Sequence, residues 1–161
     1  MLRGQNVLLF VGHYEHSIDA KLRLAVPSEV RAQLDRGEEG PGLYAVIQEG
    51  PTLALYTEKG FEKRATELDQ SQRPADEILE YELMFYSMAN RVEIDKQGRI
   101  RLPERLIKLA GLERDVVILG VKDHLQIHDR NAWNQRFEQT MRDRPQLLMN
   151  PRRLLKPDNN D

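Results

Sequence analysis

The sequence predicts a mixed α+β fold, rich in β-strands, in which one structural unit occurs twice. The first observation behind this prediction is an internal repeat, because His16–Leu34 aligns with Val92–Ala110 at a shift of 76 residues. The second is that strand and helix signals follow one another in the same order in both copies. The identical aligned pairs are Ile18 and Ile94, Asp19 and Asp95, Arg23 and Arg99, and Pro27 and Pro103.

The shift between the copies changes once along the chain. It becomes 72 where Leu53, Leu55, Phe61 and Arg64 meet Leu125, Ile127, Trp133 and Arg136. We expect the four-residue difference in the Gly-rich segment 37–42, because a loop tolerates insertions. This placement keeps the order of the elements intact. The sequence therefore predicts a tandem duplication rather than a chance similarity.

Each copy is predicted to begin with two short strands joined by a polar turn. The first strand alternates over 14–18 and again over 92–94. In the second strand, two apolar residues face the core and an arginine faces outward. These residues are Leu24, Val26 and Arg23 in the first copy, and Ile100, Leu102 and Arg99 in the second.

A short helix is then expected to open at Pro27 and at Pro103, because proline suits the first helical position. Two more strands follow in each copy, over 43–48 with 52–56 and over 116–121 with 124–128. Thr57 and Asp129 stand where N-caps belong, ahead of two amphipathic helices. Between the copies, Pro74 and the acids after it start a further helix.

These elements divide the chain into five segments. They are a leader over 1–9, a first unit over 10–57, a helical linker over 58–90, a second unit over 91–129, and a C-terminal helix with a flexible tail over 130–161. The apolar run 7–11 is too short for a signal peptide or a membrane span. We therefore expect a cytoplasmic protein that does not contact a membrane.

Composition sets broad limits on function. Lys plus Arg is 24 and Asp plus Glu is 26, which gives a formal net charge of −2 and a pI of about 6.1. This balance alone argues against a nucleic-acid-binding protein, because such domains are usually basic. The absence of cysteine excludes disulfides, thiolate metal sites and a cysteine nucleophile. No cofactor, metal or small-molecule substrate is expected.

The local charge differs from the total charge. Residues 96–108 contain five basic residues and one acidic residue, a net charge of +4. They follow an Asp-x-x-Gly turn signal, which would bring Lys96, Arg99 and Arg101 together on one edge. The first copy has a weaker cluster of Lys21, Arg23 and Arg31 against Glu29. A charged run is often only a solvated face, but arginine recurs at the same outward position in both copies, where it suits phosphates and guanine edges.

One series of features occurs twice in this chain: an Asp-x-x-Gly-Arg turn, an apolar strand, a proline and a short helix. This arrangement resembles the MraZ family of bacterial transcriptional regulators. The resemblance covers about residues 10–141 and includes Phe10-x-Gly12, the run from Asp19 to Pro27 and the run from Asp95 to Leu112. It implies two pseudo-symmetric swapped-hairpin units of the AbrB/SpoVT β-barrel type, with flanking helices.

The resemblance also implies a function. It implies a DNA-binding, nucleoid-associated regulator without enzymatic activity, which binds direct repeats in the promoter of its own division and cell wall gene cluster and usually represses it. It further implies a ring-shaped homo-oligomer. Lys21, Arg23 and Arg99 match the DNA-contacting turns of the family. We add Lys96 and Arg101 to the expected DNA-contacting residues because they are basic and are expected to face outward.

One residue departs from the family pattern. Leu22 stands where the family has glycine, whereas the second copy retains Gly98. A leucine with positive φ would cost about 1–2 kcal/mol. We therefore expect the first turn to take another geometry, which would displace Arg23.

Three other classes of function are weighed against this one. An enzyme would have to rely on His13, His16, His124 and His128, and the HLQIH spacing resembles a pair of metal ligands without a third. An AbrB-type antitoxin-like module would combine DNA binding with protein interaction, although such proteins usually carry a single unit. A purely structural ring would show no salt-sensitive affinity for DNA.

Overall fold

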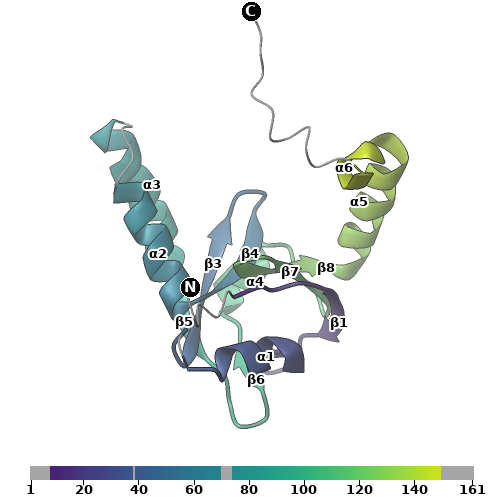
Figure 1. The fold of residues 1–161 in the computed structure, drawn as a ribbon, viewed down its shortest axis with the longest axis horizontal. Helices are drawn as coiled ribbons and strands as arrows, with labels where there is room; N and C mark the ends of the chain where they lie inside the picture. Colours follow the sequence, from purple (N-terminus) through teal and green to yellow (C-terminus); the bar gives the residue numbers. More distant parts are fainter. Residues whose placement is uncertain (1–7, 38, 70–73, 150–161) are drawn as a thin grey trace, which may run out of the picture. The chain divides into compact units, whose positions relative to one another are not determined.

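The computed structural model describes residues 8–37, 39–69 and 74–149 (Figure 1). The chain separates into two compact units, Met1–Arg130 and Asn131–Asp161. All of the strands among these described residues lie in the first unit.

The first unit is an antiparallel, mixed α+β structure, which confirms the predicted fold class. Its six-stranded sheet has the order β1 (His13–Ser17), β7 (Asp115–Val121), β8 (His124–Asp129), β4 (Thr52–Thr57), β3 (Gly42–Gln48) and β5 (Asn90–Glu93). A separate two-stranded sheet pairs β2 (Arg23–Ala25) with β6 (Arg99–Arg101).

The helices begin close to where the sequence signals place them. They are α1 (Ser28–Leu34), α2 (Glu58–Asp69), α3 (Ala75–Met88), α4 (Glu104–Leu109), α5 (Arg130–Asp143) and α6 (Gln146–Met149). Pro27 and Pro103 are the N-cap residues of α1 and α4, one position before the predicted one. Thr57 caps α2, because its hydroxyl oxygen accepts the N–H of Gly60 at 2.9 Å.

The aligned copies exchange strands with each other. The first strand of each copy pairs with a strand of the other copy, β1 with β7 and β5 with β3. At the centre, β4 pairs with β8 so that Leu53 lies opposite Ile127 and Leu55 opposite Leu125. In the sequence alignment the partners are exchanged, because Leu53 aligns with Leu125 and Leu55 aligns with Ile127. A two-fold relation between two equivalent units produces this register.

The structure shows that the length difference between the two copies lies only partly in the predicted segment. Strands β3 and β7 both have seven residues and begin at 42 and 115, a shift of 73. Strands β4 and β8 begin at 52 and 124, a shift of 72. Three of the four extra residues therefore lie in the connection before β3, as predicted. The fourth lies in the β3–β4 turn, where the sequence had not placed it.

The main core lies between the six-stranded sheet, the β2–β6 pair and the short helices α1 and α4. Its buried side chains come from both copies in matching positions, including Leu24 and Ile100, Val30 and Leu106, and Leu55 and Ile127. Burial of each such side chain stabilises the fold by roughly 1.5–3 kcal/mol. Because the core is shared, neither copy contains a complete core of its own.

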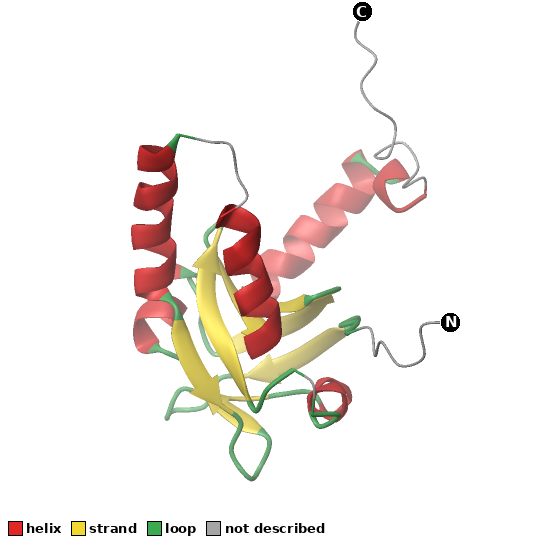
Figure 2. Cartoon of the chain, turned by 60° about the vertical axis from the view of Figure 1, so that its left-hand side comes forward, coloured by secondary structure: helices red, strands yellow, loops and turns green. Residues whose placement is uncertain are grey.

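The opposite face of the sheet is covered by the α2–α3 helices, which lie side by side (Figure 2). Phe61 of α2 stacks on Tyr44 with ring centroids 4.3 Å apart. Arg64 lies over the ring of the buried Tyr56, and its Nη1 donates to the Tyr56 hydroxyl at 2.7 Å. These contacts fix the helical linker to the first unit.

The second unit consists of α5 and α6. Helix α5 has no buried residue among its described positions, although Trp133, Phe137 and Met141 recur at intervals of four. Such spacing places them along one face of the helix. Within the described residues of the whole chain, no helix combines the length and apolar character that crossing a membrane requires.

Candidate nucleic-acid interface

Both polar turns are built around an aspartate side chain. In the first turn, Asp19 Oδ1 accepts the backbone N–H groups of Lys21 and Arg23, each at 2.9 Å. In the second, Asp95 Oδ1 accepts those of Gln97 at 2.8 Å and Arg99 at 3.0 Å. A local side-chain acceptor of this kind fixes the turn without help from neighbouring elements. The two turns therefore share one hydrogen-bond pattern.

The same aspartates hold the turn arginines. Arg23 Nε lies 2.7 Å from Asp19 Oδ2, and Arg99 Nε lies 3.2 Å from Asp95 Oδ2. The arginine side chains are 31% and 29% exposed, so the pairs contribute little to stability. Their effect is to orient the guanidinium through Nε.

Hydrogen bonding also keeps the turn aspartates ionised. The backbone N–H of Arg23, donated to the carboxylate, is the largest influence on the pKa of Asp19, which lies below its usual value. The pKa of Asp95 is lowered in the same way, first by the backbone N–H of Arg99. Both aspartates therefore remain charged partners of the arginines.

The prediction that Leu22 forces another geometry on the first turn is wrong. Leu22 adopts a φ of +63°, Gly98 a φ of +77°, and both N–H groups donate to the carbonyl of the turn aspartate at 3.0 Å. Arg23 is consequently not displaced. The apolar side chain of Leu22 packs against the main core, and this contact offsets the cost of the left-handed backbone.

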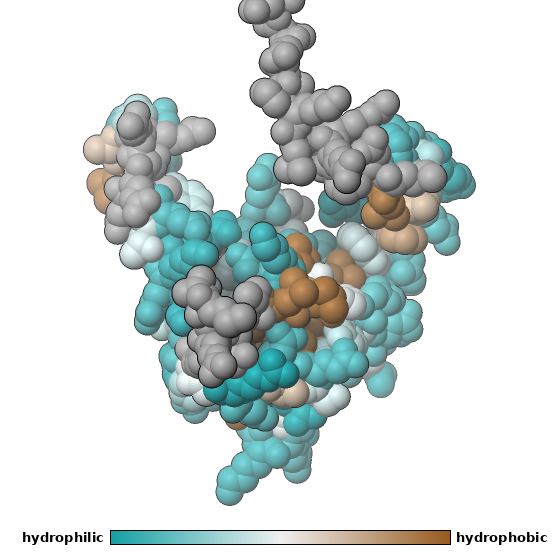
Figure 3. Space-filling model, in the orientation of Figure 1, coloured by the Kyte–Doolittle hydropathy of each residue, from teal (hydrophilic) through white to brown (hydrophobic). Residues whose placement is uncertain are grey.

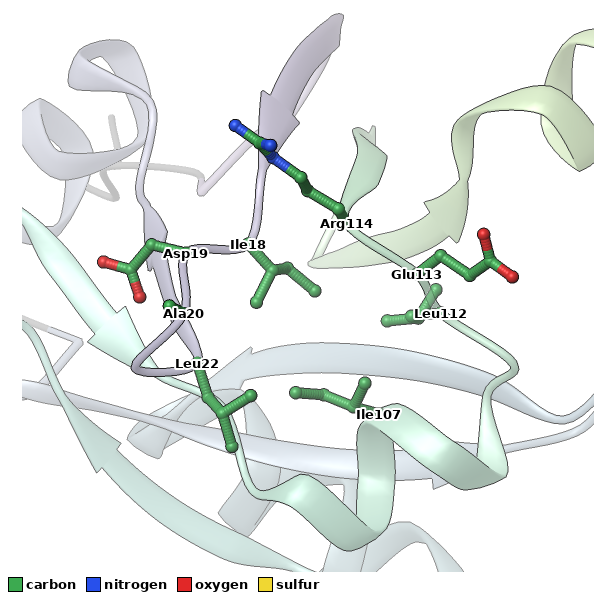
Figure 4. Close-up of a pocket in the computed structure, with 8 residues that line it drawn as sticks. All are labelled: Ile18, Asp19, Ala20, Leu22, Ile107, Leu112, Glu113 and Arg114. Atoms are coloured by element: carbon green, nitrogen blue, oxygen red, sulfur yellow. The ribbon is translucent and has the colours of Figure 1, made fainter.

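Leu22 lies in an open hollow of about 540 Å³ beside the first turn (Figure 4). In Figure 4, Ile18, Leu22 and Ile107 point toward this hollow, whereas Asp19 and Arg114 point away from it. The surroundings of the Leu22 side chain are thus mainly apolar. This apolar environment explains why leucine is accepted at a position that favours glycine.

The β2–β6 pair carries arginines on its outward face. Arg23 lies directly opposite Arg101, and Arg99 lies opposite Ala25. Leu24 and Ile100, at the alternate positions, are buried. Like charges directly opposite each other destabilise a sheet, so stability does not explain the Arg23–Arg101 pair.

The structure brings the five predicted residues onto this hairpin pair and its two turns. Lys21, Lys96 and Arg101 are exposed, and Arg23 and Arg99 are partly exposed. Lys21, Arg23 and Arg101 gather at one end, and Lys96 and Arg99 lie at the other. The turn before β6 projects from the body of the first unit (Figure 1), and its surface is hydrophilic (Figure 3).

One residue near this surface escapes the sequence analysis. Arg31 of α1 donates from Nε to the carbonyl of Val26 at 3.1 Å, and its guanidinium lies against Gly98 of the second turn. Arg31 is one of the basic residues counted in the first copy, but its position beside the second turn does not follow from the sequence. The available signal is that Arg31 aligns with an apolar residue, Ile107, in the repeat.

Two of the four histidines considered for catalysis or metal binding, His124 and His128, make other side-chain contacts. His124 stacks on Tyr56 and lies 2.8 Å from Asp123 Oδ1. Gln126 separates the two histidines of HLQIH, with Oε1 2.9 Å from His128 Nε2 and Nε2 3.1 Å from His124 Nε2. Among the residues that the structure describes, no cluster of three or more His, Asp or Glu side chains could hold a metal ion.

The antiparallel α+β fold thus presents arginines from two paired hairpins, each beside a cationic β-turn. Residues 85–146, which run from the end of α3 through the second copy, match a family model described as "MraZ protein, putative antitoxin-like". The match confirms the resemblance to the MraZ family over residues 85–146, which are part of α3, the whole second copy and α5. MraZ is a regulator-like, non-enzymatic family of DNA-binding proteins.

Proposed function

We propose that this protein is a sequence-specific transcriptional regulator that represses its own division and cell wall gene cluster from the nucleoid. The observation that carries the proposal is that an arginine, oriented by an aspartate, stands at the same position of both turns. Lys21, Lys96 and Arg101 add positive charge around these arginines. Double-stranded DNA is the partner whose charge and geometry fit this face.

The β2–β6 pair supports DNA reading by its shape as well as its charge. The DNA major groove admits a two-stranded β-ribbon, and an arginine fork can donate two hydrogen bonds to a guanine edge or a phosphate. In each turn the aspartate accepts a hydrogen bond from the arginine Nε, the guanidinium nitrogen nearest the backbone. The terminal Nη groups are then the part of the guanidinium that meets DNA.

The net charge of −2 does not oppose this function. The local positive charge lies around the turns, whereas helix α3 contributes four acidic residues and no basic residue. Binding to DNA depends on the local field at the contact surface and falls steeply with salt. An acidic total is therefore compatible with a cationic binding face.

Self-association into a ring is the second part of the proposal. Helix α5 exposes Phe137 and Met141, and α6 exposes Leu148. A 14-residue helix without buried residues has little stability in isolation. A second copy of the chain would bury this stripe, and a ring would bring several pairs of turns to successive direct repeats.

The DNA-binding proposal is tested by fluorescence anisotropy with a labelled duplex from the region upstream of this gene. We expect steep salt dependence, with about 0.9 added to the log–log slope for each phosphate contacted. Arg99→Gln should weaken binding at least several-fold and leave folding intact, because the side chain lies on the outward face. Arg36→Gln, at an exposed position after α1, is the matched control for charge.

Two outcomes would contradict the proposal. Equal affinity of Arg99→Gln and the parent chain would remove the turn from the interface. Equal affinity for one direct repeat and for several would argue against a ring that binds as a unit. A weak and salt-independent titration would instead favour the second candidate, an antitoxin-like module that acts through the apolar stripe of α5, which the description of the matched family also suggests.

A further inference from the structure

We propose that Arg31 of the first copy is a phosphate-contacting residue of the second turn, so that the two turns bind DNA unequally. The inference rests on the proposed DNA-binding function and deepens it. It assigns a role to a residue that lies 65 positions before Lys96 in the chain and reaches the turn only through the fold. Its ligand is the phosphodiester backbone beside the second turn.

Two hydrogen bonds connect Arg31 with the second turn. The N–H of Val26 donates to the carbonyl of Gly98 at 2.8 Å, which joins the end of the first hairpin to the second turn. Arg31 Nε donates to the carbonyl of the same Val26 at 3.1 Å. Helix α1 supports this position, because its buried residues Val30 and Leu34 anchor it in the core. The guanidinium is thus held in place before any ligand arrives.

Gly98 allows the close approach of Arg31. A Cβ atom at Gly98 would lie 2.7 Å from Arg31 Cζ and 2.8 Å from both Nε and Nη1, so a side chain here would displace the guanidinium, the flexible end of Arg31. The φ of +77° favours glycine at this position, and the missing side chain leaves room for the guanidinium of Arg31. Loss of this space would push the guanidinium away from the turn.

Arg31 keeps most of its hydrogen-bonding capacity. A guanidinium has five N–H donors, and Nε is the only one of them with an acceptor among the described residues. The acid of the same helix, Glu29, accepts the hydroxyl of Tyr14 instead. A fixed cation with further donors, held against Gly98 of the turn that also carries Lys96, suits an anionic oxygen, and the phosphates of DNA provide such oxygens.

The first turn has no equivalent of this arrangement. At the positions that correspond to Gly98 and Arg31, it has Leu22 and Ile107, which face the same apolar hollow (Figure 4). Its additional cation is Arg101, which comes from a different position and lies across from Arg23. The two turns therefore present different surfaces to DNA, although their backbones are alike.

The test compares Arg31→Gln, Arg31→Lys and the control Arg36→Gln by anisotropy titration of the promoter duplex over a series of salt concentrations. Arg99→Gln provides the slope change for one lost contact per chain. We expect Arg31→Gln to lower the slope by a similar amount and to weaken binding several-fold at low salt. Arg31→Lys should keep most of the slope, because it keeps the charge. Arg36→Gln should change neither quantity.

The outcomes separate this inference from the proposed function. If the parent chain binds steeply, Arg99→Gln weakens it and Arg31→Gln behaves like Arg36→Gln, the role of Arg31 is overturned and the proposed function stands. If the parent chain shows no salt-dependent binding, both fail. Circular dichroism melts show whether Arg31→Gln has unfolded. If it has, Arg31→Lys is the deciding variant. An unchanged salt slope with weakened binding supports the inference, whereas full parental affinity contradicts a forked phosphate contact.

Discussion

At the level of single residues, each turn aspartate performs two tasks with separate oxygens. One oxygen closes the turn by accepting two backbone N–H groups, and the other holds the arginine. Because both tasks use the ionised carboxylate, protonation of Asp19 or Asp95 affects the turn and the arginine together. The shape of the turn and the orientation of its cation are therefore linked to one ionisation.

This linkage gives the first expectation, which concerns acid stability. The folded-state pKa values of Asp19 and Asp95 lie below the usual value near 3.9, so their contribution to stability is complete above that pH and is lost as the pH falls toward the lowered values. We expect the double variant Asp19→Asn, Asp95→Asn to lose less stability than the parent chain between pH 5 and pH 2. Denaturant unfolding at these two pH values measures the difference, and equal losses would show that other groups dominate.

Sequence reasoning predicted what is local at this scale. The turn positions of Asp95, Gly98 and Arg99 follow from short-range hydrogen bonding, as does the cap at Thr57. The geometry of Leu22 did not follow, because an apolar contact with residues far along the chain outweighs its backbone preference. Arg31 was missed for the same kind of reason, since its contact with the second turn depends on the exchange of elements between the copies.

At the level of elements, helix α5 differs from α2 and α3 in its apolar stripe, which consists of Trp133, Phe137 and Met141. Those two helices bury aromatic side chains against the sheet, whereas α5 has none of its described residues buried. Arg64 of α2 and Arg136 of α5, which align in the repeat, show the same contrast. Arg64 is partly buried over Tyr56 and bonded to its hydroxyl, and Arg136 lies exposed over Trp133. Phe137 and Met141 of α5 are exposed, whereas Phe85 of α3 is buried.

The expectation at this scale is that Phe137→Glu reduces the oligomer. Phe137 is 48% exposed in the single chain, so the substitution should not disturb the fold of the first unit, but it would place a charge in a buried contact between copies. Gln135→Glu is the matched control, because it adds the same charge to the same helix at an exposed position away from the stripe.

Light scattering after size-exclusion chromatography measures the mass of each variant over a range of concentrations. We expect a smaller assembly for Phe137→Glu and the parental mass for Gln135→Glu. Identical masses for all three proteins would remove the α5 stripe from the assembly surface.

At the level of the whole molecule, the shared core makes the two copies dependent on each other. Strand β1 of the first copy finishes beside β7 of the second, and β5 finishes beside β3. The order of elements and the repeat are visible in the sequence, because each signal spans only a few residues. The exchange of strands between copies joins residues about 100 positions apart, such as Tyr14 and Ile118, and came from the family resemblance rather than from a local pattern.

The corresponding expectation is that neither copy folds as a monomer. A fragment that ends before β5 lacks the partners of β1 and β2, and a fragment that begins at β5 lacks the partners of β5 and β6. We expect each fragment alone to be unfolded or to self-associate, and a mixture of the two to recover native circular dichroism. A folded monomeric fragment, identified by its mass in light scattering, would show that one copy can form a complete core.

Placing both hairpins in one chain also gives the proposed DNA-binding unit a direction. Two identical hairpins related by a two-fold axis would have to carry the same residues at both turns, and such symmetry matches inverted DNA half-sites. Here one turn combines Gly98 with Arg31 and the other combines Leu22 with Ile107, so the unit has a distinguishable head and tail. If the proposed ring places such units side by side along a duplex, their head and tail would favour DNA sites that all point the same way.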